Sequence, residues 1–207
     1  GRMLGAPDVA SPLVITNSDF RFIVAEQLAA EGIIPSAIMI EPAAKNTGPA
    51  ILAAAVHLAA THPDALLLVM PTDHAIPDVD AFRAAVAAGV PRAVAGQIVT
   101  FGIRPDRPET GYGWIEVDAA PVEGRAQQVR RFVEKPAMEK AEAMLAEGRY
   151  LWNAGIFLVS AKVLLDAVGE HAPDLVAPVA EAVGEARADL DFLRLAEGPW
   201  DRVRDIS

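Results

Sequence analysis

The chain has 207 residues, of which 52% are hydrophobic and 22% are charged, and this ordinary globular composition excludes wholesale disorder. Its formal net charge of −10 argues against nucleic acid or an anionic membrane as a partner. The absence of cysteine excludes disulfides and a cysteine nucleophile, and neither a membrane-spanning run nor a signal peptide is visible, so we expect a cytoplasmic protein.

The first half of the chain alternates short apolar runs with amphipathic segments. Helices are expected after Asn17 and Ser18, which can cap a helix start, and at residues 46–60 and 78–89. Strands are expected at residues 12–16, 37–41, 65–70 and 97–103. This alternation predicts an α/β fold with a mainly parallel sheet and helices on both of its faces.

The pattern changes at residues 104–113, which form a loop rich in proline and glycine. A helix is expected at about residues 137–147, and strands are expected within residues 114–118, 127–136 and 155–160. We expect these strands to be mixed additions beside or across the parallel sheet. Roughly the last forty residues are alanine-rich and predict helices.

Polar residues at the carboxyl ends of parallel strands are the first candidates for function, because open α/β sheets bind ligands there. Asp73, in the stretch PTDH after the third expected strand, offers a hard oxygen ligand that suits Mg²⁺. A turn aspartate, or one that caps the next helix, explains Asp73 equally well.

Two further stretches carry polar or flexible residues. Lys45, Asn46 and Thr47 stand where a helix begins, and the free N–H groups there attract anions or polar bases. An ordinary helix cap is the commoner use of Asn and Thr. The stretch ETGYGW, residues 109–114, places two glycines around Tyr112 and permits close approach of a ligand, although a tight turn needs such glycines too.

Glu134 and Lys135 end the strand in FVEKP, where Pro136 stops it. Neighbouring side chains of a strand point to opposite faces, so this carboxylate and ammonium need not neutralise each other. A lysine suits a phosphate, and a glutamate accepts hydrogen bonds from sugar hydroxyls. A solvated strand end is the alternative interpretation. The sequence has no P-loop, dinucleotide-binding fingerprint or nucleophile elbow.

Six stretches follow one another along the chain: LVITNSDFRFIVAEQL, IEPAAKNTGPAI, VMPTDHAI, VTFGIRPDRPETGYGWIE, FVEKP and WNAGIFL. Together they resemble the sugar-phosphate nucleotidylyltransferases, and within them the mannose-1-phosphate guanylyltransferases. The resemblance covers most of the chain up to about Ser160 and implies a Rossmann-like fold. It also implies transfer of a guanylyl group from GTP to mannose 1-phosphate, which yields GDP-mannose and pyrophosphate.

The resemblance further implies roles for single residues. Asp73 would be an Mg²⁺ ligand and Lys135 the ligand of the sugar phosphate, and both would be catalytic. The other implied substrate contacts are Glu134, Asn153 and Gly113 to the sugar and Glu41, Asn46 and Thr47 to the guanine nucleotide.

Two parts of the family pattern have no counterpart in the sequence. The glycine-rich loop that cradles the triphosphate is not found before Pro12, and the segment with a second metal carboxylate is not found before the end at Ser207. We therefore expect residues 1–207 to form a nucleotidylyltransferase domain without these parts, and weak or no catalysis by this chain alone.

Two other functions stay open. One is another sugar-1-phosphate nucleotidylyltransferase, with a different base or sugar. The other is a non-catalytic module that binds sugar nucleotides. A homo-oligomer is compatible with the sequence, which does not determine the oligomeric state.

Overall fold

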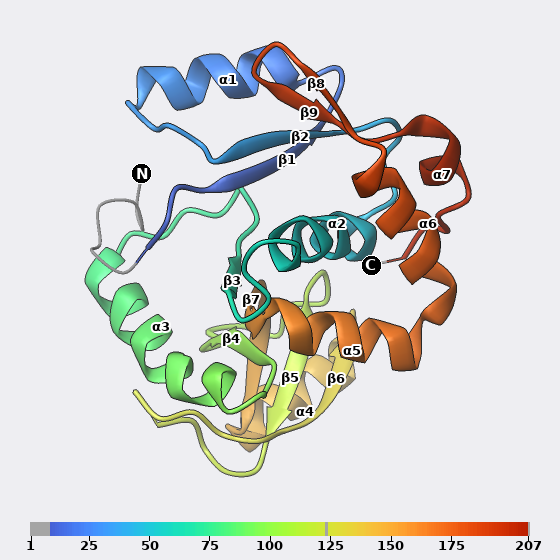
Figure 1. Ribbon diagram of the computed structural model, residues 1–207. Coiled ribbons are helices and arrows are strands. Elements are labelled where there is room, and N and C mark those ends of the chain that lie inside the picture. The colour runs from blue at the N-terminus through green and yellow to red at the C-terminus, as the bar shows by residue number, and fades with distance from the viewer. Residues whose placement is uncertain (1–8, 123, 207) are drawn as a thin grey trace. The chain divides into compact units, whose positions relative to one another are not determined.

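The computed structural model describes residues 9–122 and 124–206, which divide into two compact units (Figure 1). Unit 1 comprises the described residues up to Ala65 and from Ser160 onward, and unit 2 comprises Leu66–Val159. The stretch before Pro12, where no triphosphate loop was found, lies outside the described residues except for residues 9–11. That the whole chain works as one nucleotidylyltransferase domain stays a prediction.

Sheet A belongs to unit 1 and has the strand order β1-β2-β9-β8. β2 pairs in parallel with both β1 and β9, and β8 pairs antiparallel with β9. The strands are β1 (Leu13–Asn17), β2 (Ala37–Glu41), β8 (Arg187–Asp189) and β9 (Phe192–Arg194).

Helices cover both faces of sheet A, because β2 is apolar on both sides. Ile38 and Ile40 pack with Ala25 and Leu28 of α1 (Arg21–Ala30). Met39, which points to the other face, belongs to the larger core of unit 1. That core is built with α2 (Thr47–Ala59), α5 (Ala161–His171), α6 (Pro173–Gly184) and α7 (Glu197–Asp201).

Sheet B belongs to unit 2 and has the strand order β3-β7-β5-β6, with β4 also paired to β7. The pairs β4–β7, β5–β7 and β5–β6 are antiparallel. The strands are β3 (Leu66–Val69), β4 (Val99–Ile103), β5 (Gly113–Val117), β6 (Val129–Glu134) and β7 (Tyr150–Ser160).

Two helices complete unit 2, α3 (Val79–Val94) and α4 (Met138–Glu147). Ala141 and Met144 of α4 pack in a core with Trp114, Val133 and Trp152. None of the helices in the described part of the chain is long and apolar enough to cross a membrane.

The predicted α/β class is confirmed, with parallel strands and helices on both faces in sheet A. Three details were not predicted. The strands divide between two sheets, and β4 is antiparallel to its partner β7. The hairpin β8–β9 lies in a segment that was predicted to be helical. The sequence did not indicate it because its strands have only three residues each and alanine-rich sequence surrounds them.

Candidate active site

Three of the residues with implied sugar contacts meet in unit 2, where β5 begins and β6 ends. The strand register places Gly113 opposite Glu134. A Cβ atom at Gly113 would lie 2.8 Å from Oε2 of Glu134 and 3.6 Å from Cβ of Asn153. The missing side chain therefore lets the Glu134 carboxylate lie across the start of β5, beside Asn153.

Asn153 lies on β7 with only one end of its amide engaged. Its Oδ1 accepts hydrogen bonds from the Gly155 amide at 3.1 Å and from the Thr100 hydroxyl at 3.3 Å. Its Nδ2 lies 3.9 Å from the position that a Cβ at Gly113 would take. Because Nδ2 makes no hydrogen bond to the described residues, it can donate to a ligand next to the Glu134 carboxylate.

Lys135 stands directly after β6, and its backbone leaves the strand with φ of 40°. Its ammonium lies 3.8 Å from Oε1 of Glu134, and both side chains are largely exposed. The expectation that these two side chains point to opposite faces was wrong, because Lys135 no longer has strand geometry. Carboxylate and ammonium instead form a loose, solvent-exposed pair that a ligand can enter.

Asp73 lies in a turn after β3, in unit 2, and its side chain is 86% exposed. Asp78, not Asp73, caps α3, because its carboxylate accepts a hydrogen bond from the Ala81 amide. Within residues 9–122 and 124–206, no group of three or more His, Asp or Glu side chains could hold a metal ion. One exposed carboxylate fits Mg²⁺ shared with substrate phosphates and water, not a cage made by protein alone.

Glu41 ends β2 in unit 1 with one carboxylate oxygen in an unusual position. Its Oε1 is buried and has no hydrogen-bond partner among the described residues. Burial raises the pKa of Glu41 to about 7, because a charged carboxylate loses its hydration there. A ligand that brings N–H donors to this oxygen would satisfy it.

Asn46 and Thr47, also in unit 1, stand at the start of α2. The backbone of Asn46 has φ of 62°, and its side chain makes no capping hydrogen bond. Its amide instead donates a hydrogen bond to the carboxylate of Asp205. The Gly48 amide donates to the Ile206 carbonyl at 3.1 Å, so the end of the described chain already uses one of the free N–H groups of this helix.

The structure reveals two supporting residues that the sequence analysis did not single out. Asp205 is 159 positions away from Asn46, and no local pattern signals such a pair. Glu109 binds the Gly111 amide at 2.9 Å through its carboxylate. An acid two residues before a glycine, inside a loop, is the one sequence signal that could have pointed to this contact.

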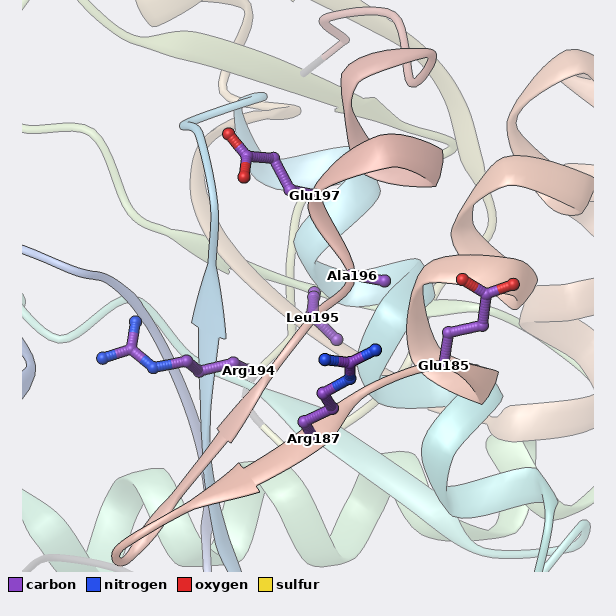
Figure 2. A pocket seen from close by; sticks show the side chains of 6 residues that line it. All are labelled: Glu185, Arg187, Arg194, Leu195, Ala196 and Glu197. Carbon is purple, nitrogen blue, oxygen red and sulfur yellow. The ribbon is translucent and has the colours of Figure 1, made fainter.

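Unit 1 also contains a cavity of about 290 Å³ that includes none of the residues predicted for the site (Figure 2). Arg194 extends from β9 and forms an ion pair with Asp189 at 2.5 Å. The cavity is lined by Glu185, Arg187, Arg194, Leu195, Ala196 and Glu197. Its charges of both signs favour no particular ligand.

Comparison with known proteins identifies the relatives of this chain. The chain is 45% identical over 199 residues to a mannose-1-phosphate guanylyltransferase of Escherichia coli K12, with 94% of this chain and 42% of the relative covered. It is 43% identical over 207 residues to one of Sinorhizobium fredii, with 100% and 40% covered. The chain thus spans less than half the length of these curated relatives.

The fold has a close counterpart among solved structures. A crystal structure described as mannose-6-phosphate isomerase from Helicobacter pylori matches with a TM-score of 0.82 and 30% sequence identity, covering 95% of this chain and 76% of that one. Residues 3–203 match the family described as nucleotidyl transferase. The resemblance seen in the sequence is confirmed, and the chain belongs to the nucleotidyl transferase family.

Proposed function

We propose that this protein transfers a guanylyl group from GTP to mannose 1-phosphate, which yields GDP-mannose and pyrophosphate. One observation carries the proposal: Glu134 lies over Gly113 and beside Asn153, with the Lys135 ammonium 3.8 Å from its carboxylate. A hydroxyl acceptor, an amide donor and a cation in one place suit a sugar phosphate. Relatives 43–45% identical to this chain are named mannose-1-phosphate guanylyltransferase.

In this proposal, unit 2 binds the acceptor. The Glu134 carboxylate accepts hydrogen bonds from sugar hydroxyls, and Nδ2 of Asn153 donates one. Gly113 keeps the space above β5 open, and Lys135 binds the phosphate as a point charge. No catalytic base is needed, because the sugar phosphate is already a nucleophile. The residues contribute by holding and orienting it, which is the main source of catalysis in such transfers.

Contacts to the guanine nucleotide are assigned to Glu41, Asn46 and Thr47 in unit 1. Guanine carries N–H donors on its Watson–Crick edge, which is the chemistry that the unpartnered Oε1 of Glu41 lacks. Asn46, whose side chain donates a hydrogen bond to Asp205, and Thr47 follow Glu41 along the chain and stand at the start of α2. This assignment comes from the family resemblance and is supported by the buried oxygen.

Asp73 would hold Mg²⁺ together with phosphate oxygens of the substrates. When bound, the ion would neutralise charge on the phosphates. The exposed carboxylate is free to approach such a complex, and among the described residues the His74 ring nitrogen lies 3.9 Å from it. A cytoplasmic location completes the proposal, in line with the absence of cysteine.

The direct test mixes the chain with GTP, Mg²⁺ and mannose 1-phosphate and follows the release of pyrophosphate. Glucose 1-phosphate and ATP serve as controls for the sugar and the base. Slow release that requires both GTP and mannose 1-phosphate is the expected result, because the sequence predicts at most weak catalysis by this chain alone. Binding of mannose 1-phosphate without any release would favour the non-catalytic binding module, and release with the control substrates would favour another sugar-1-phosphate nucleotidylyltransferase.

A further inference from the structure

Lys135 has a backbone conformation that its surroundings must enforce. A φ of 40° is unfavourable for a lysine, and residues in such regions persist only where other contacts fix them. The contact here is a hydrogen bond of 3.2 Å from the Lys135 amide to the carbonyl of Tyr112. The position of the Tyr112 carbonyl therefore decides where the lysine side chain starts.

The turn that carries Tyr112 is tied at both ends to one residue, Glu109. Oε1 of Glu109 accepts a hydrogen bond from the Gly111 amide at 2.9 Å. The backbone carbonyl of Glu109 accepts one from the indole of Trp114 at 2.8 Å. Through side chain and backbone together, Glu109 fixes the path of the chain on either side of Tyr112.

The Glu109 side chain is itself held by Arg107, which packs on Trp152. Nε and Nη2 of Arg107 each lie 3.3 Å from its Oε2. The Arg107 guanidinium stacks 4.9 Å from the ring centre of Trp152, against which the Tyr112 ring packs edge-on at 5.4 Å. The bond from Gly111 and the pairing with Arg107 lower the pKa of Glu109, so its carboxylate is ionised at neutral pH.

We propose that Glu109 is a positioning residue for the sugar-phosphate site, which holds Lys135 in place through the backbone of the turn at Gly111 and Tyr112. Glu109 does not touch the substrate in this proposal. Its role rests on the proposed function, in which Lys135 binds the phosphate of mannose 1-phosphate. The claim that Glu109 fixes the Lys135 backbone can be tested without any substrate.

The test compares the full chain with its variants Glu109→Ala, Glu109→Gln and Asp106→Ala. Glutamine keeps an oxygen that can accept from Gly111, whereas alanine removes it. Asp106 is the matched control, because it binds Arg107 at 3.1 Å but makes no contact with the turn among the described residues. Amide hydrogen exchange at Lys135, measured by NMR, and calorimetric affinity for mannose 1-phosphate are the two readouts.

In Glu109→Ala, the hydrogen bond between Glu109 and the Gly111 amide is lost. Exchange of the Lys135 amide should then become about tenfold faster, and the affinity for mannose 1-phosphate should fall about tenfold. Glu109→Gln should stay within about threefold of the wild type in both readouts, and so should Asp106→Ala. If Glu109→Ala does not fold, Glu109→Leu, which keeps the volume but offers no acceptor, must show the same two losses.

Unchanged exchange at Lys135 in a folded Glu109→Ala or Glu109→Leu protein would overturn the proposal. Faster exchange with unchanged affinity would overturn it as well, because Glu109 would then not act on the site. A wild-type chain that does not bind mannose 1-phosphate would refute the proposed function instead. The exchange rates would still decide whether Glu109 holds the Lys135 backbone.

Discussion

Replacement of Lys135 by alanine is the sharpest test of the acceptor site. Two unit charges 4 Å apart near a protein surface attract each other by about 4 kcal/mol at an effective dielectric constant of about 20. Binding a phosphate also disturbs the exposed pair of Lys135 with Glu134, which at this exposure is worth about 0–1 kcal/mol. The difference of about 3 kcal/mol corresponds to about 10²-fold in affinity.

The assay is calorimetric titration of Lys135→Ala with mannose 1-phosphate, together with pyrophosphate release where the chain turns over. Affinity should fall about 10²-fold, and turnover should fall about 10²–10³-fold because a preorganised charge is lost. Lys140→Ala, which removes an exposed lysine from α4, should change neither quantity. Unchanged sugar-phosphate affinity in Lys135→Ala would refute the assignment of the phosphate to this residue.

Three further changes test Gly113, Asp73 and Glu41. Gly113→Ala should lower the affinity for mannose 1-phosphate at least about tenfold, because the added Cβ would lie 2.8 Å from Oε2 of Glu134. Gly169→Ala, which adds a Cβ in open space, is the control in the same calorimetric titration. Asp73→Asn should raise the Mg²⁺ concentration needed for half-maximal pyrophosphate release about tenfold or more, and an unchanged requirement would contradict its role. Because the pKa of Glu41 is raised from 4.5 to about 7, the folded chain binds more protons than the unfolded chain between these pH values. Glu41 therefore contributes fully to the stability of the folded chain below pH 4.5, and this contribution is lost as the pH rises through 7. Between pH 4.5 and 7, the free energy of unfolding measured in urea should fall by about 1–2 kcal/mol, a value reduced for the partial exposure of Glu41. The Glu41→Gln variant should lack this fall, and equal pH profiles for the variant and the wild type would contradict the assignment.

The sequence predicted most helices and strands of unit 1 because these rest on local patterns, whereas the roles of the candidate residues in unit 2 came from the family resemblance and stay predictions. Apolar runs such as residues 37–41 become strands buried on both faces, and such a run is visible in the sequence without any partner. FVEKP marks a strand end by the proline that follows it. The pairing of β4 with β7 could not be predicted, because register and direction depend on residues about 50 positions away.

Single residues of the candidate site also differ in whether local sequence or distant pairing determines their position. Glu134 and Gly113 stand out in their sequence stretches and Asn153 was named from the family resemblance, but their approach depends on an antiparallel register that places Gly113 opposite Glu134. The reversal of Lys135 toward Glu134 was missed for a related reason. A φ of 40° arises from the bond to Tyr112, and the sequence of the strand alone predicts continued alternation.

These observations indicate what holds the residues of the proposed acceptor site in place. The residues proposed to touch the substrate, Glu134 and Lys135, are exposed and form a weak pair, so their own contact cannot fix them. In the proposal the order comes from the neighbouring loop, where Arg107 stacks on Trp152 and pairs with Glu109, and Glu109 accepts a hydrogen bond from the Gly111 amide. Exposed groups on a rigid support bind a polar ligand at a low cost in ordering entropy. A substitution in the support should therefore weaken binding while leaving the charges of the site intact.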